Sequence, residues 1–162
     1  ISQGKLNYKN ISDRLIHYDG AKLPFENNRF DVVTMFDVLE HIESVHEFLE
    51  KEIRRVLKSG GMLMFQTPNK YTNIPWEVLS HRSISFYKRY HVSLQSYRSL
   101  CHLLQSSGFI DISIEKRNIW TPYHVNQLKK SLGFLAYPAL FIGNSLPVRW
   151  ATNFWGCCRT ET

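Results

Sequence analysis

The stretch from residue 19 to residue 69 constrains the fold more than any other part of the chain. It holds two runs rich in apolar residues, DVVTMF at 31–36 and MLMFQT at 62–67. Runs of this length are expected of strands that are buried on both faces. Between them, apolar residues recur every three or four positions from Val45 to Leu57, as in a helix with one buried side. A strand, a helix and a strand with short connections predict parallel pairing through a right-handed crossover.

The ends of this helix and of the second strand also have sequence signals. Ser44 and Glu47 have the spacing of a capping box, which predicts the helix start. Gly60 and Gly61 predict its end, because glycine accepts the left-handed backbone that follows a helix. Pro68 closes the second strand.

The rest of the chain predicts a single α/β domain with few further elements. These are a short strand at 15–18, an irregular aromatic and basic segment at 70–92, a helix from near Ser93 to Gly108, a half-exposed or edge strand at 109–115, a partly helical apolar segment at 120–150 and a last strand at 152–159.

Composition excludes several classes of protein. Hydrophobic residues make up 43% of the 162 residues and charged residues 21%, which is typical of a globular domain and not of a disordered chain. The longest apolar stretch, 133–143, contains Pro138 and is shorter than the about 20 residues that cross a bilayer. The net charge of +6 is spread along the chain, which favours a solvated surface and makes nucleic acid an unlikely partner.

The three cysteines indicate a compartment. Cys101, Cys157 and Cys158 have neither the number nor the spacing of a disulfide framework or a zinc site. A reducing, cytoplasmic location is expected.

Several short motifs in order carry a family resemblance. In order along the chain come an acidic residue followed by small residues and LPF, then FDVV, LEHI, an RVLK-x-GG helix end and a strand ending in Pro-Asn. Over about residues 15–115, this series of motifs resembles the class I S-adenosylmethionine (SAM)-dependent methyltransferases. The resemblance implies a partial Rossmann-like three-layer sandwich whose mostly parallel sheet has an antiparallel last strand. It implies one domain over 1–162 that lacks the family's first strands, with 120–150 as an apolar insertion before the last strand.

The resemblance also implies a SAM pocket at the carboxyl ends of the strands. Asp19 matches the acidic residue that meets the adenine amino group, with backbone N–H groups of Gly20 or Ala21 beside it. Phe36 and Asp37 match the strand end that lines the methionine side. The alternatives are a turn aspartate at 19, a core ring at 36 and the start of a turn at 37.

Two histidines are the candidate catalytic residues. His41 lies beyond a strand end and His91 just before the second predicted helix, and an imidazole titrates near working pH, as a general base must. A backbone-bonded structural role is the alternative for His41. Asp37, Glu40, His41 and His91 are also similar to the metal-binding set of small-RNA 3′-end methyltransferases, although we expect no metal.

The family's glycine-rich loop has no counterpart in this sequence. No G-x-G pattern occurs, and the first residue is Ile1. We expect residues upstream of Ile1 to supply it; strands from another chain, or a remnant with an altered structure, are the alternatives. A remnant would keep the strands near Asp31, Met62, Phe109 and Thr152 as a sheet, and residues 1–20 would detach or pair elsewhere.

The expected function is SAM-dependent methyl transfer to a small-molecule acceptor, most simply at a hydroxyl oxygen. The acceptor pocket would lie in the 70–92 and 120–150 segments, whose aromatic and basic residues suit a planar or anionic acceptor. The segment 120–150 could also contact a membrane surface peripherally. The alternatives are a non-catalytic domain that binds a partner and a metal-dependent RNA methyltransferase. The oligomeric state is not predicted.

Overall fold

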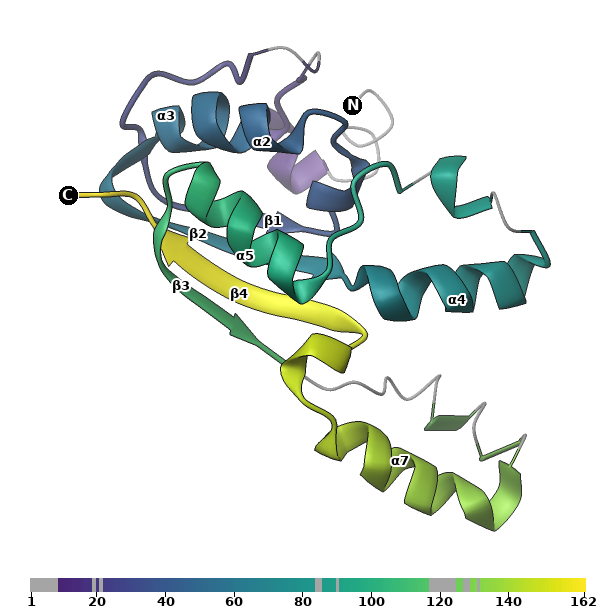
Figure 1. Ribbon diagram of the computed structural model, residues 1–162. Coiled ribbons are helices and arrows are strands. Elements are labelled where there is room, and N and C mark those ends of the chain that lie inside the picture. The colour runs from purple at the N-terminus through teal and green to yellow at the C-terminus, as the bar shows by residue number, and fades with distance from the viewer. Residues whose placement is uncertain are drawn as a thin grey trace.

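The computed structural model describes residues 9–18, 20, 22–83, 86–89, 91–116, 125–126, 129–130 and 132–162. They form a twisted sheet with helices packed on one face, and further helices beyond one end of the sheet (Figure 1). The strands are β1 (Phe30–Phe36), β2 (Leu57–Pro68), β3 (Ile110–Glu115) and β4 (Asn153–Arg159). The α-helices are α2 (Val45–Phe48), α3 (Arg54–Val56), α4 (Lys70–His81), α5 (Tyr97–Ser106) and α7 (Ala136–Ser145). Short 3₁₀ or π turns are η1 (Lys9–Arg14), η2 (Leu39–His41), η3 (Leu49–Ile53), η4 (Phe86–Arg89), η5 (Gly133–Leu135) and η6 (Val148–Trp150).

The sheet has the order β1-β2-β4-β3. β1 pairs with β2 in parallel, and β4 is antiparallel to both β2 and β3. Three strands therefore run one way, and the last strand runs against them from its place between two of the others. This confirms the predicted mostly parallel sheet with an antiparallel last strand. It also confirms β3 as an edge strand.

The predicted helix after the first strand forms, but its ends differ from the prediction. Ser44 precedes α2 without a capping hydrogen bond, and Glu47 instead accepts from Lys51 at 2.8 Å. The helical segment runs through η3 and α3 and ends at Val56, so β2 already contains Gly60 and Gly61. The C-terminal tail explains the longer strand, because Gly60 N–H donates to the Glu161 carbonyl oxygen.

Two helices lie elsewhere than the sequence indicates. The segment after β2 is not irregular, because Asn69 caps α4 by accepting from the Tyr71 N–H at 3.1 Å. α5 begins at Tyr97 and not near Ser93, since Ser96 and Ser99 form the capping box that fixes its start. Its predicted end is close to the observed one, with Gly108 in the left-handed region.

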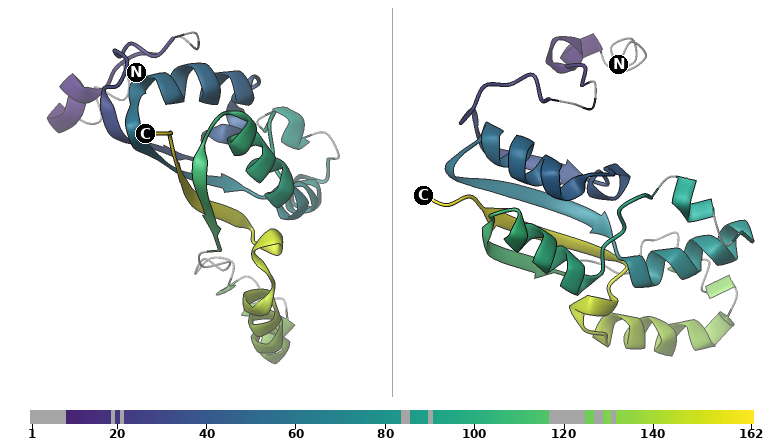
Figure 2. Two further views of the ribbon diagram at one scale, coloured as in Figure 1. Left: turned by 60° about the vertical axis from the view of Figure 1, so that its left-hand side comes forward. Right: turned by 45° about the horizontal axis from the view of Figure 1, so that its top comes forward.

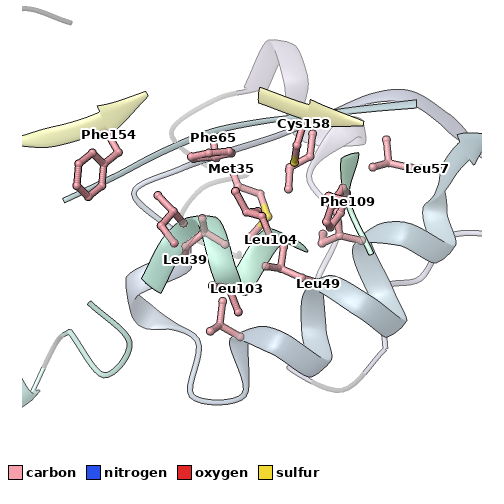
Figure 3. Close-up of a cluster of buried hydrophobic side chains, with 14 of the residues drawn as sticks. Met35, Leu39, Leu49, Leu57, Phe65, Leu103, Leu104, Phe109, Phe154 and Cys158 are labelled. Atoms are coloured by element: carbon pink, nitrogen blue, oxygen red, sulfur yellow. The ribbon is translucent and has the colours of Figure 1, made fainter. Parts of the chain in front are cut away.

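One hydrophobic core joins the sheet to the helical layer (Figure 3). Leu49 from the first helical segment and Leu104 from α5 are fully buried against Phe65 of β2 and Phe154 of β4. Cys158 of β4 belongs to this core, where burial and the neighbouring Cys157 raise the pKa of its thiol to about 12. All three cysteines are free, which agrees with the sequence; the cytoplasmic location stays a prediction.

The opposite face of the sheet and the outer edge of β1 are open. Val32 and Phe36 are 47% and 48% exposed, so the predicted burial of this strand on both faces is wrong. In the part of the chain that the structure describes, β1 pairs only with β2, and the core helices lie on one face. The sandwich is therefore present as two of its three layers.

Residues 15–18 form no strand, so the prediction there is wrong as well. A strand needs a neighbour for its backbone groups, and residues 15–18 have no place in the described sheet. The preceding turn η1 lies apart from the sheet in both views of Figure 2.

The segment before β4 is helical in part, as predicted. Several large apolar side chains of η5 and α7 face solvent, including Phe134 at 79% and Phe141 at 74% exposure. Among the described residues, no helix has both the length and the apolar character needed to cross a membrane.

The LPF turn is clamped to the first helical segment by a partly buried ion pair. Glu52 accepts from Arg55 at 2.6 Å and from the Leu23 N–H at 2.8 Å, while Arg55 also donates to the carbonyl oxygens of Leu23 and Phe25. Burial acts to raise the pKa of the Glu52 carboxyl, but the bonds from Arg55 and Leu23 outweigh it and the pKa lies below its ordinary value. The turn therefore packs on the protein through charge-assisted hydrogen bonds.

Replacing Glu52 with Gln should lower the free energy of unfolding at pH 7 by about 1–2 kcal/mol, the loss of charge-assisted bonds to partly buried donors. Because folding depresses this pKa, the stabilisation is present above the unfolded value and is lost as pH falls through the folded value. Urea unfolding at pH 7 and at a pH below the folded pKa of Glu52 should show the difference only at pH 7. Glu47→Gln, in the exposed pair with Lys51, is the control and should change nothing measurable. An equal difference at both pH values would contradict the clamp.

Candidate functional site

The carboxyl ends of β1 and β2 meet at one edge of the sheet. Phe36 is in register with Gln66, and the Asp37 N–H donates to the Gln66 carbonyl oxygen at 3.0 Å. Asp37 has φ +52°, a left-handed conformation that a residue with a side chain rarely adopts. Such backbone strain recurs at functional positions, and here it marks the turn that leads from β1 to the candidate site.

A buried carboxylate lies directly after this turn. Glu40 in η2 is 1% exposed, and its Oε2 accepts from Thr67 Oγ1 of β2 at 2.9 Å. The Glu40 carbonyl oxygen accepts from the Ser93 N–H at 3.0 Å, which ties the segment before α5 to the same place. A carboxylate this deep needs such partners, because burial without them is costly.

Both candidate histidines lie beside this carboxylate. The rings of His41 and His91 are 5.1 Å apart between centroids, and His41 Nε2 lies 3.9 Å from Glu40 Oε1. The His41 side chain is 46% exposed, whereas that of His91 is mostly buried. The structure thus joins two residues 50 positions apart into one cluster, which we call the carboxylate–histidine cluster (Glu40, His41 and His91).

A second carboxylate faces His91 from α4. Glu77 Oε1 lies 2.8 Å from His91 Nδ1, although the direction is not that of a hydrogen bond. His91 Nδ1 and Glu77 Oε2 are accordingly buried atoms without a hydrogen-bond partner in the described part of the chain. A small change of ring orientation would let Nδ1–H donate to Glu77 and direct Nε2 toward the cluster.

The cluster can bind or move protons and can also hold a cation. Glu40, His41 and His91 each offer one ligand atom, and these atoms lie within 4.8 Å of one another. Asp37, the fourth residue of the metal set considered from the sequence, is not in this group. An imidazole next to a buried carboxylate is equally the arrangement of a general base and its orienting group.

Gly20 and His41 line one cavity of about 520 Å³, together with Tyr18 and Phe48. The rings of Tyr18 and Phe48 are 6.0 Å apart, and Gly20 has φ +93° with open space where a side chain would be. The cavity therefore offers aromatic surface next to accessible backbone, which suits a flat heterocycle.

The other predicted cofactor residues lie outside this cavity. Asp19 and Ala21 fall outside the described residues. Phe36 packs against Trp155 on the open face, with ring centroids 5.6 Å apart. Asp37 is exposed at the turn between that face and the cluster. Their role toward a cofactor stays a prediction.

Sequence reasoning missed one residue of the site, Glu77, and one contact, that between Thr67 and Glu40. Thr67 ends a predicted strand, and strand ends were expected to face the ligand, but nothing indicated that its hydroxyl would bind Glu40. Glu77 lies in a segment expected to be irregular, so its helical position facing His91 had no signal. The capping position of Asn69 would have predicted α4 and brought Glu77 into consideration.

The family whose sequence profile matches is described as "Methyltransferase domain", and the match covers residues 6–114. A probable S-adenosylmethionine-dependent methyltransferase of Mycobacterium tuberculosis is 32% identical over 94 residues, which are 58% of this chain and 32% of that protein. A demethylmenaquinone methyltransferase of Staphylococcus saprophyticus is 42% identical over 62 residues, 38% of this chain and 26% of that protein. The chain thus spans about a third of the length of the curated relatives it matches.

Solved structures share the fold. A SAM-dependent methyltransferase from Thermotoga maritima matches with a TM-score of 0.63 at 16% identity, over 96% of this chain and 70% of that one. Phosphoethanolamine N-methyltransferase 2 of Haemonchus contortus, solved with S-adenosyl-L-methionine, matches with a TM-score of 0.55 at 16% identity, over 95% and 40%.

The order of the sequence motifs, the directions of the strands and the family match over residues 6–114 all indicate the same family. The sheet carries its candidate site at the carboxyl ends of β1 and β2, where open α/β sheets bind their ligands. The chain belongs to the methyltransferase-domain family, within the class I SAM-dependent methyltransferases.

Proposed function

We propose that this protein transfers a methyl group from SAM to a hydroxyl oxygen of a small molecule. The observation that carries the proposal is the carboxylate–histidine cluster, which stands at the strand ends and lies next to a cavity that includes Gly20. Family membership supports the cofactor, and the cluster supports an acceptor that must lose a proton. The chain's relatives include proteins named as N-methyltransferases, whose amine acceptors need no such base when neutral.

Bound SAM would supply an electrophilic methyl group on a sulfonium, so the protein has mainly to position the acceptor and take its proton. His41 would accept that proton at a ring nitrogen; the methyl carbon would exchange its bond to the sulfonium sulfur, which leaves as a neutral thioether, for a bond to the acceptor oxygen. Glu40 stabilises the imidazolium from 3.9 Å. His91 packs on His41 and limits its ring orientation.

The residues present fit one side of the cofactor. Gly20, with its backbone uncovered, and the aromatic pair Tyr18 and Phe48 suit the adenine. Asp19 and Ala21 would complete the adenine contacts, and Phe36 and Asp37 the methionine side.

Calorimetric titration of the chain with S-adenosylhomocysteine tests this assignment. We expect saturable binding, and Asp37→Ala should weaken it by about tenfold, the loss of roughly one charge-assisted hydrogen bond. Asp31→Ala is the matched control at the other end of β1, where Asp31 pairs with Lys58, and should leave binding unchanged. No binding by the wild-type chain would contradict the proposal and favour a non-catalytic domain.

A metal-dependent RNA methyltransferase is the second candidate, and the 4.8 Å grouping of Glu40, His41 and His91 favours it. Mixed carboxylate and imidazole ligands suit Zn²⁺ or Mn²⁺. Glu77 would then be the carboxylate that orients a ligating histidine from behind.

Treatment with EDTA distinguishes the two candidates. If the reaction needs no metal, EDTA should change neither the affinity for S-adenosylhomocysteine nor the midpoint of unfolding. Titration with Zn²⁺ should then show equally weak binding for the wild type and for His91→Gln. Tight Zn²⁺ binding that His91→Gln removes would overturn the metal-free proposal. Salt-sensitive retention of RNA would then support the RNA acceptor.

We also propose that the segment around α7 contacts membranes peripherally. Phe134 and Phe141 are the most exposed aromatic residues there, and Lys129 and Lys130 lie nearby on the surface. The chain should co-sediment with anionic vesicles, and Phe134→Ser with Phe141→Ser should abolish this. Val32→Ser with Val38→Ser, at two exposed apolar positions in β1 and in the turn after it, is the control. Equal loss in both double variants would refute a specific contact.

A further inference from the structure

A second large cavity, of about 620 Å³, lies where α4 and α5 begin and where η6 precedes β4. Its walls come from three separate parts of the chain, including Tyr71, Tyr97 and Trp150. None of its lining residues belongs to the carboxylate–histidine cluster or to the cavity at Gly20.

The walls of this cavity are aromatic. The rings of Tyr71 and Trp150 are 6.5 Å apart between centroids and inclined by 43°. Tyr71 is 60% exposed and Trp150 is 47% exposed, so both offer ring surface to a ligand. Flat aromatic or conjugated molecules gain most from such surfaces.

The charges of this cavity are all of one sign. Arg98 and Arg149 line it, both are exposed, and no acidic residue is among its lining residues. Neither guanidinium has an ion-pair partner in the part of the chain that the structure describes. A guanidinium pairs with carboxylate or phosphate through parallel hydrogen bonds and also stacks on aromatic faces.

A buried amide holds one wall in place. Asn69 is fully buried at the end of β2, and its Nδ2 donates to the carbonyl oxygens of Arg149 at 3.0 Å and Ala151 at 2.8 Å. The Thr72 hydroxyl donates to the same Ala151 oxygen at 3.2 Å. η6 is therefore tied to the start of α4, and the pocket is formed before a ligand arrives.

We propose that this pocket binds a flat aromatic molecule carrying a carboxylate or phosphate, and that this molecule is the methyl acceptor. The second part rests on the proposed function. Asn69, which caps α4, follows Thr67 of β2 by two residues, so the wall that Asn69 holds and the cluster both depend on the end of β2. The aromatic part would lie against Tyr71 and Trp150, with the anionic group on Arg98 and Arg149.

Nuclear magnetic resonance titration of the full chain tests the binding without any cofactor. The probes are 2-naphthoate and its neutral analogue 2-naphthamide, and the readout is the indole N–H signals of the four tryptophans, with Trp150 assigned by Trp150→Phe. We expect 2-naphthoate to shift the Trp150 signal saturably and 2-naphthamide to bind about tenfold more weakly. Inorganic phosphate should compete with 2-naphthoate.

Charge variants locate the anion. Arg98→Gln with Arg149→Gln should weaken 2-naphthoate by about tenfold or more and leave 2-naphthamide unchanged. Arg14→Gln with Arg29→Gln removes the same charge from exposed positions that do not line the pocket, and should have no effect. Equal affinity for the two probes, or no effect of the Arg98 and Arg149 changes, would overturn the anionic class. A shift of Trp155 in place of Trp150 would place the probe on the open sheet face and overturn the site.

Failure of this titration is distinguishable from failure of the proposed function. The naphthoate experiment reports only on the pocket, whereas the S-adenosylhomocysteine titration reports only on the cofactor side. If the chain binds 2-naphthoate but not S-adenosylhomocysteine, the pocket is supported as a binding site and its role in methyl transfer is contradicted.

Discussion

The antiparallel ladder between β2 and β4 is the constraint on which the other elements depend. Seven residue pairs, from Met62 with Arg159 to Pro68 with Asn153, bring the last part of the chain into the middle of the sheet. At one end of this ladder, the tail extends β2 back to Leu57 through its bonds to Gly60 and Gly61. At the other end, it places residues 149–151 against Asn69, which fixes η6. A single pairing thus sets both the length of the central strand and the wall of the aromatic pocket.

The candidate site depends on the same strand through one buried acid. Glu40 has almost no exposure, and the Thr67 hydroxyl satisfies one of its oxygens from β2. Because His41 follows Glu40 directly, the position of its ring is set by the anchored carboxylate. His91 reaches the cluster by a different route, through the bond between Ser93 N–H and the Glu40 carbonyl oxygen. The cluster is therefore held by β2 and η2 even though its two imidazoles lie far apart in sequence.

Local patterns in the sequence predicted the elements well where burial follows periodicity. The strands near Asp31, Met62, Phe109 and Thr152 and the two core helices were all expected, because their apolar residues repeat with the right spacing. Element ends were predicted poorly. Gly60 and Gly61 predicted a helix end, but their backbone hydrogen bonds to Glu161 and Thr160 in the C-terminal tail make them part of β2. His41 and His91 were identified as candidates, whereas the Glu77 and Thr67 contacts depend on tertiary packing that no local pattern encodes.

The free edge of β1 has a consequence for the handling of this chain. The strand FDVVTMF lacks proline and glycine, and its outer row of N–H and carbonyl groups has no partner strand in the described sheet. Exposed apolar edges of this kind are templates on which further strands assemble, and many natural proteins protect them with charges or bulges. Here the pair of Asp31 and Lys58 places charge at one end of the strand and Asp37 follows the other end, whereas the residues between, 32–36, carry no charge. Self-association through this edge would make the aggregated fraction of the chain rise with concentration, and Thr34→Lys is the simplest protection.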